Sequence, residues 1–151
     1  MKKITKNLEE TQKLAKEFVD SLNAMKEKGQ INKEAIVIAL FGDLGSGKTS
    51  FVQAIAKNFN IKEGVISPTF VIQKNYPIKN NKNFKNLIHI DAYRLDNPEE
   101  ILTLGWHELV KNENNLIFVE WPEKIGDHIP KGHKKIYFEF LDPETRSIDV
   151  V

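Results

Sequence analysis

The fold is decided by the stretch Gly42-Asp43-Leu44-Gly45-Ser46-Gly47-Lys48-Thr49, which matches the pattern Gly-x-x-x-x-Gly-Lys-Ser/Thr of a phosphate-binding loop. Its glycines allow the backbone to wrap around an anion with the N–H groups pointing inward. From this surface-accessible loop, we expect Lys48 to place its charge on the outer phosphates. The Thr49 hydroxyl is expected to bind Mg²⁺. The stretch therefore predicts a nucleotide site.

The residues on either side of the loop have the patterns that such a loop requires. Residues 35–41 form a continuous apolar and β-branched run, which is typical of a parallel strand covered on both faces. After the loop, apolar residues recur at three- and four-residue intervals, as on one face of a helix. These are Phe51, Val52, Ile55, Ala56 and Phe59. A buried strand, the loop and a helix thus follow one another, and the positive end of the helix dipole points at the anion.

Length and composition set the general class of the protein. At 151 residues, the chain is long enough for one domain with a sizeable core, and its hydrophobic content of 40% is ordinary for a globular protein. The net charge of +1 argues neither for nor against a nucleic-acid partner, and the lack of cysteine excludes disulfides and thiolate chemistry. Charged residues interrupt the N-terminal region and no apolar run approaches transmembrane length. We therefore expect a cytoplasmic protein that does not bind membranes.

The rest of the chain predicts an α/β fold of the P-loop NTPase type, with a central, mostly parallel or mixed sheet flanked by helices. A short edge strand is expected around Ile4, followed by a helix that Asn7 caps together with Glu10. The other elements are predicted from alternation, turn residues and helix-start signals. They are a hairpin of strands 70–76 and 87–90, a helix from Asn97-Pro98, a buried strand 116–119, and a C-terminal hairpin of strands 134–140 and 147–151 at the sheet edge.

Two of the predicted strands end in an acid, Asp91 after residues 87–90 and Glu120 after residues 116–119. Hydrolysis or transfer of a phosphoryl group needs a carboxylate that holds or orients Mg²⁺. In doubly wound sheets such groups lie at the carboxyl ends of buried strands. Both acids fit this role, and each also fits the simpler role of a cap or turn residue. The residues alone leave the choice between Asp91 and Glu120 open.

Four further side chains have both a functional and a structural interpretation. Thr69 follows Pro68 in a fixed turn and fits a switch that reaches the γ-phosphate, or a turn alone. His89 is most simply a buried core histidine, and Arg94 fits either a phosphate contact or a structural ion pair. Trp121 either closes over the site or anchors the core.

Four motifs, taken in their order along the chain, resemble those of the bacterial TsaE (YjeE) family of small P-loop ATPases. They are the glycine loop 42–49, Ser67-Pro68-Thr69-Phe70, His89-Ile90-Asp91-Ala92-Tyr93-Arg94-Leu95 and Val119-Glu120-Trp121-Pro122-Glu123. Many ATPases share the first motif, whereas the other three together are specific. The resemblance covers essentially the whole chain, with no departure at the motif positions.

The resemblance implies that residues 1–151 form a single P-loop ATPase domain. Its function would be in making N6-threonylcarbamoyladenosine at position 37 of tRNAs that read codons starting with A. It implies binding of ATP and ADP with Mg²⁺, and slow ATP hydrolysis by the chain alone. It also implies association with the TsaB–TsaD heterodimer, which hydrolysis would reset between turnovers. Contact with tRNA would be indirect, and no DNA partner is expected.

The resemblance also assigns roles to residues by motif. Lys48 would hold the phosphates, Thr49 and Glu120 would ligate Mg²⁺, and Asp91 would orient water or the metal shell. Thr69 would be a switch element and Trp121 a lid. The implied catalytic residues are Asp91, Glu120, Lys48 and Thr69. The implied nucleotide contacts are Asp43, Leu44, Gly45, Ser46, Gly47, Lys48, Thr49, Ser50 and Trp121.

Three other nucleotide-dependent functions are alternatives to this one. A small-molecule kinase is the main alternative, but such kinases usually clamp the transferred group with several arginines, and the chain has only Arg94 and Arg146. A GTP switch needs Asn-Lys-x-Asp, which neither 32–35 nor 81–84 matches, and Asp-x-x-Gly, which 91–94 does not match. A nucleotide-binding adaptor without catalysis stays open.

Overall fold

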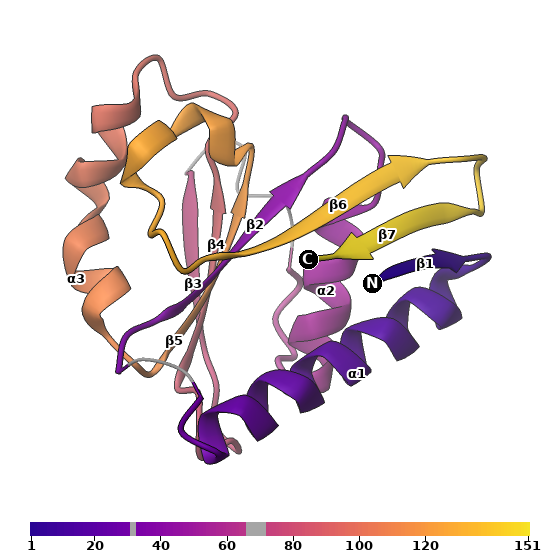
Figure 1. Ribbon diagram of the computed structural model, residues 1–151, viewed down its shortest axis with the longest axis horizontal. Helices are drawn as coiled ribbons and strands as arrows, with labels where there is room; N and C mark the ends of the chain where they lie inside the picture. Colours follow the sequence, from indigo (N-terminus) through magenta and orange to yellow (C-terminus); the bar gives the residue numbers. More distant parts are fainter. Residues whose placement is uncertain (31–32, 66–71) are drawn as a thin grey trace.

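A computed structural model describes residues 1–30, 33–65 and 72–151. These residues form a seven-stranded sheet in the order β1-β7-β6-β2-β5-β4-β3, with helices on both faces (Figure 1). Its centre is parallel, because β2 (Ile36–Phe41) pairs in parallel with both β5 (Asn115–Glu120) and β6 (Lys134–Phe140). β4 (Asn86–Asp91) adds in parallel on the far side of β5. The predicted α/β fold with a mixed sheet is confirmed.

The sheet becomes antiparallel toward both ends. β3 (Gln73–Pro77) pairs with β4, and β7 (Arg146–Val150) pairs with β6, as the two predicted hairpins require. β1 (Lys2–Thr5) pairs with β7 and forms the last strand, which confirms the expected edge strand. The start of the predicted strand 70–76 and the turn with Thr69 lie outside the described residues.

One face of the sheet is covered by α1 (Leu8–Glu27) and α2 (Lys48–Asn58) (Figure 1). The N-cap of α1 is as predicted, because Asn7 Oδ1 accepts a hydrogen bond from the Glu10 N–H at 2.8 Å. In a capping box, the side chain of the third helical residue also accepts a hydrogen bond from the backbone N–H of the cap residue, and here that second bond is shifted by one residue. The Glu10 carboxylate accepts from the N–H of Lys6 at 2.7 Å instead of from the cap residue itself.

The other face is covered by shorter helices. The helix predicted to begin at Asn97 is instead a 3₁₀ helix, η1 (Pro98–Leu104), followed by α3 (Trp106–Lys111). The two are separate because Gly105 lies between them in the left-handed conformation, with φ 72°, and interrupts the helical hydrogen bonding. Two further 3₁₀ turns, η2 (Pro122–Lys124) and η3 (Gly126–His128), follow β5. In the part of the chain that the structure describes, no helix has the length and apolarity needed to span a bilayer.

The apolar residues divide into one core on each face of the sheet. In β4, Leu87 belongs to the core under α1 and α2, whereas Ile88 and Ile90 belong to the core under α3. Side chains alternate along a strand, so His89 and Asp91 lie on the α2 face with Leu87. The same alternation places Glu120 of β5 on that face, after Leu116 and Phe118. The polar ends of both strands are thus on the side from which the phosphate loop enters α2.

Candidate nucleotide-binding site

The loop between β2 and α2 has the backbone of an anion cradle. Gly45 and Gly47 have φ angles of 78° and 105°, a left-handed region that residues with a side chain rarely adopt. α2 begins directly after Gly47, so the free N–H groups of its first turn are at the end of the loop. This arrangement supplies backbone donors and the positive end of the helix dipole at one point.

Lys48 was expected on a surface-accessible loop, but the residue is buried and only 5% exposed. The ammonium group turns back onto the loop, where it donates to the backbone oxygens of Gly42 and Asp43. It also lies 4.3 Å from the centre of the Trp121 ring. Burial lowers the pKa of Lys48 below its ordinary value, and nearby acidic side chains partly oppose this shift. The positive charge is therefore held inside the cradle.

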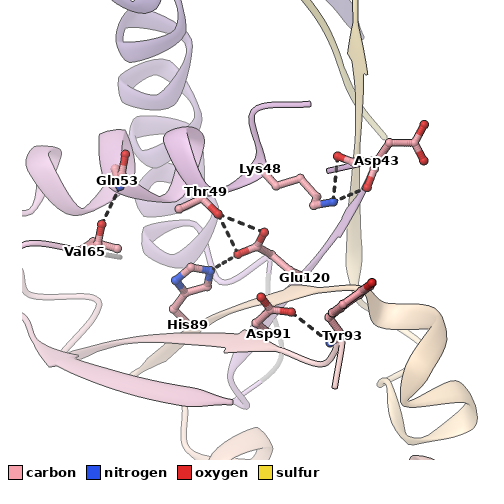
Figure 2. A network of polar contacts seen from close by, with 10 residues as sticks. Asp43, Lys48, Thr49, Gln53, Val65, His89, Asp91, Tyr93 and Glu120 are labelled. Atoms are coloured by element: carbon pink, nitrogen blue, oxygen red, sulfur yellow. Dashed lines mark hydrogen bonds and ion pairs between the residues drawn. The ribbon is translucent and has the colours of Figure 1, made fainter. Parts of the chain in front are cut away.

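Thr49 and Glu120 are in direct contact although they are far apart in the sequence. The Thr49 hydroxyl lies 3.2 Å and 3.3 Å from the two carboxylate oxygens of Glu120 (Figure 2). Glu120 ends β5 and is 4% exposed. The contact joins the first turn of α2 to the carboxyl end of a central strand. The two residues that the resemblance assigns to Mg²⁺ are thus side by side.

Asp91 ends β4 in register with Glu120, so the two predicted acids occupy neighbouring strand ends. Asp91 is 6% exposed, and its Oδ1 accepts a hydrogen bond from the Tyr93 N–H at 3.0 Å (Figure 2). This bond to the chain two residues on is the turn-forming contact expected of an aspartate. Glu120 therefore contacts the end of the phosphate loop, while Asp91 shapes the turn beside it.

His89 contacts the same carboxylate, which the sequence interpretation missed. It is fully buried, as predicted for a core histidine, but its Nε2 lies 2.5 Å from Glu120 Oε2. The signal that points to this contact is its position two residues before Asp91, on the same face of β4. Without the register between β4 and β5, that spacing did not identify a partner.

Two aromatic side chains lie at the mouth of the site. Trp121 adopts the left-handed conformation with φ 57°, which is strained for a bulky residue. Its ring packs against Tyr93 with 5.1 Å between ring centres, and Tyr93 is 45% exposed. Trp121 thus contacts both Lys48 and the partly exposed Tyr93, and its role as a lid stays a prediction.

A cavity of about 850 Å³ joins these groups, a size within the range of small-molecule sites. Its lining includes residues 43–50 of the loop together with Asp91, Glu120 and Trp121, so every predicted contact that the structure describes borders it. The cavity also extends beside the start of α1 and the β6–β7 hairpin. That part is lined by Asn7, Leu8, Thr11, Pro143, Glu144, Arg146 and Ile148. No sequence motif marks these residues, because the packing of α1 and the hairpin brings them together.

Comparison with known proteins assigns a family to this combination of loop and strand-end acids. A family model described as "Threonylcarbamoyl adenosine biosynthesis protein TsaE" matches residues 5–148. The chain belongs to the TsaE family.

Curated relatives of this TsaE-family chain carry the same description. The tRNA threonylcarbamoyladenosine biosynthesis protein TsaE of Rickettsia felis is 37% identical over 149 residues, which are 98% of this chain and 78% of the relative. The protein of that name from Haemophilus influenzae is 29% identical over 119 residues, 79% of this chain and 72% of the relative. The crystal structure of Bacillus subtilis YdiB is similar with a TM-score of 0.70 and 29% identity, and the match covers 99% of this chain and 83% of that one.

Thr69, the predicted switch residue of this TsaE-family chain, lies outside the described residues. The residues that flank its segment are attached near the site. Gln53 of α2 donates a hydrogen bond to the Val65 carbonyl at 2.7 Å (Figure 2), and the Asp91 N–H donates to the Ile72 carbonyl at 2.8 Å. One flank is thus fixed to α2 and the other to the end of β4.

The donor atoms at this site match the preference of Mg²⁺. Thr49 supplies a hydroxyl oxygen and Glu120 two carboxylate oxygens, and Mg²⁺ is a hard cation that takes oxygen ligands. Within residues 1–30, 33–65 and 72–151, no group of three or more His, Cys, Asp or Glu side chains is arranged to hold a metal. Nucleotide sites usually hold Mg²⁺ through one or two protein ligands, with phosphates and water completing the shell. Thr49 and Glu120 fit that pattern.

Proposed function

We propose that this chain binds ATP with Mg²⁺ in the cavity at residues 43–50 and hydrolyses it. In this proposal it is the ATPase component of the machinery that makes N6-threonylcarbamoyladenosine at position 37 of tRNA. The biosynthetic role is supported by membership of the TsaE family and by the names of the curated relatives. The ATPase part depends mainly on one observation, the contact of the Thr49 hydroxyl with the Glu120 carboxylate at the end of β5.

Binding is assigned to the loop and the start of α2. The backbone N–H groups of residues 43–50 and the positive end of α2 would hold the phosphates, since both favour negative charge. Lys48 would exchange its bonds to the carbonyls of Gly42 and Asp43 for bonds to phosphate oxygens. Thr49 and Glu120 would hold Mg²⁺, which neutralises charge on the phosphates as the bond breaks.

Catalysis is assigned to the two strand-end acids and the groups around them. Asp91 is proposed to orient the attacking water or the water ligands of the metal, because it occupies the strand end next to Glu120. Trp121 and Tyr93 are proposed to cover the site and exclude bulk water, which strengthens the electrostatic interactions inside it. The proposed role of Thr69 as a switch toward the γ-phosphate remains a prediction.

The partner of the proposed reaction is the TsaB–TsaD heterodimer. Hydrolysis by the chain alone is expected to be slow, and contact with that pair is expected to stimulate it and to reset the pair between turnovers. The chain would then contact tRNA only indirectly, in the cytoplasm. The resemblance to the TsaE family supports each of these proposals.

The test is an ATPase assay of the purified chain, alone and with the TsaB–TsaD pair and tRNA. Lys48→Ala serves as the control for contaminating activity. Strong stimulation by the pair is expected, together with ADP and inorganic phosphate as products. Phosphate that appears on a small acceptor would instead favour the kinase alternative. If the chain bound the nucleotide but hydrolysed it neither alone nor with the TsaB–TsaD pair and tRNA, a non-catalytic adaptor would be favoured.

A further inference from the structure

His89 is a buried polar residue in a place where an apolar residue would fit the core. It is fully buried in the middle of β4, on the α2 face of the sheet and in register with Phe118 of β5. Burying an imidazole ring costs free energy unless its nitrogen atoms find partners. A leucine or phenylalanine would avoid this cost, so a specific contact of the ring has to account for a histidine here.

The ring has one specific contact, and it is with Glu120. The distance between His89 Nε2 and Glu120 Oε2 is 2.5 Å, and both side chains are at least 95% buried (Figure 2). An ionised carboxylate can only accept hydrogen bonds, so the ring carries a proton on Nε2 and donates it to Oε2. The same carboxylate accepts from the Thr49 hydroxyl on α2. Glu120 is therefore held between a helix on one side and β4 on the other.

The second ring nitrogen shows that the contact with Glu120 is the main interaction of this side chain. His89 Nδ1 is buried and has no hydrogen-bond partner among the residues that the structure describes. A histidine that stabilised the core by its polar contacts would be expected to pair both nitrogens, because an unpaired buried polar atom is costly. The ring instead makes one bond, and that bond is directed at the acid beside the phosphate loop.

We propose that His89 is a positioning residue, whose Nε2–H fixes the Glu120 carboxylate in the orientation in which it meets Thr49 and Mg²⁺. The inference rests on the proposed function, because it assumes that Glu120 is a ligand of the ion. Oε2 is held by His89, which leaves the other oxygen, 3.2 Å from the Thr49 hydroxyl, aligned toward the loop. Carboxylates that ligate metals are commonly fixed by such outer hydrogen bonds, and removing the partner lowers metal affinity by about 10- to 100-fold.

A matched pair of variants separates the bond from the space that the ring fills. Glutamine is long enough to place an N–H donor near the position of Nε2, whereas asparagine reaches only the position of Nδ1. For His89→Asn, we expect the Mg²⁺ concentration at half-maximal binding of a fluorescent ADP derivative to rise about 10- to 100-fold. The affinity for the same ADP derivative in EDTA should stay within about twofold, because His89 does not line the cavity. His89→Gln should recover most of the Mg²⁺ requirement of the unmodified chain.

Thermal unfolding of both variants shows whether a stability loss alone explains the result. A histidine that acts only in the core would lower the melting temperature and leave the Mg²⁺ requirement unchanged, and this result would overturn the proposal. Equal Mg²⁺ requirements of His89→Gln and His89→Asn would overturn it as well.

A measurement on the unmodified chain keeps the test independent of how the variants fold. In a ¹⁵N-histidine spectrum, His89 should carry a proton on Nε2, and a ring protonated on Nδ1 alone would contradict the proposed bond. Failure of the proposed function is a different result. In that case the unmodified chain would show no Mg²⁺-dependent binding of ADP, whereas failure of the His89 role alone leaves that binding intact.

Discussion

Gly42→Ala is expected to destabilise the protein although the substitution adds a single methyl group. Gly42 has φ 149°, and a Cβ atom there would lie 2.6 Å from the backbone oxygen of Phe138 in β6 and 2.6 Å from Ser46 Oγ. The backbone oxygen cannot rotate away, so the loop or β6 has to shift. The backbone conformation costs about 1–3 kcal/mol and the overlap about 1–3 kcal/mol more. At roughly 2–4 °C per kcal/mol for a chain of this size, this total of about 2–6 kcal/mol should lower the melting temperature by about 4–24 °C.

The assay is thermal unfolding followed by circular dichroism, with two glycine controls. Gly45→Ala has a positive φ of 78° but no atom within 4 Å of the added methyl, so it isolates the conformational cost. Gly132→Ala has neither feature and should melt close to the unmodified chain. If Gly42→Ala melted with Gly132→Ala, the close packing of the loop on β6 would be refuted. Because residues 43–50 line the cavity in which the phosphates are proposed to bind, the same shift of the loop should also weaken nucleotide binding.

Three further substitutions address the charge, the acid and the helix cap. Lys48→Ala should keep the fold, judged by circular dichroism, and weaken ATP binding about 10- to 100-fold in calorimetric titration, because a charge-assisted bond contributes about 1.5–3 kcal/mol. Unchanged ATP affinity would contradict the site. The pKa of Lys48 is lower in the folded chain than in the unfolded chain, so between these two values the unfolded chain binds more protons than the folded chain. The free energy of unfolding should therefore rise with pH in this alkaline range, and Lys48→Ala should flatten the rise. Glu120→Ala should suppress ATP turnover more than ATP binding, because a metal-side acid acts mainly as charge develops in the transition state. Wild-type turnover in that variant would transfer the role to Asp91. Asn7→Ala removes the bond to the Glu10 N–H and should lower the unfolding free energy by about 1 kcal/mol, or about 2–4 °C in melting temperature, whereas Asn7→Asp, which keeps the acceptor, should restore it.

The central elements were predictable because their signals are local. The apolar run 35–41, the glycine loop and the apolar stripe after it determine β2, the loop and α2 without reference to the rest of the chain. The helix from Asn97 was only partly predictable. Its start signal is local, but Gly105 divides it into η1 and α3, and a single glycine in a helical pattern does not by itself show whether the helix continues.

The burial of the candidate site residues could not be predicted from the motifs that name them. The motif named Lys48 as the cation of the loop but gave no indication that the ammonium would be enclosed. Its enclosure depends on the carbonyls of Gly42 and Asp43 and on the ring of Trp121, which directly follows β5. Such contacts depend on how β5 is placed against β2, and this placement is set by the whole core.

The pairing of His89 with Glu120 shows why register limits what a motif can reveal. Both strands end in an acid, and the structure places Asp91 opposite Glu120, so His89 lies opposite Phe118, two residues before the acid. On a shared face, a long side chain reaches the diagonal neighbour two residues along the adjacent strand, which for His89 is Glu120. If the pairing of β4 with β5 shifted by one residue, the side chain of His89 would lie on the opposite face of the sheet from Glu120, and the contact would be lost. The apolar residues Leu87, Ile88 and Ile90 hold β4 between the two cores and exclude that shift. The same residues that stabilise the sheet therefore decide which acid the buried histidine meets.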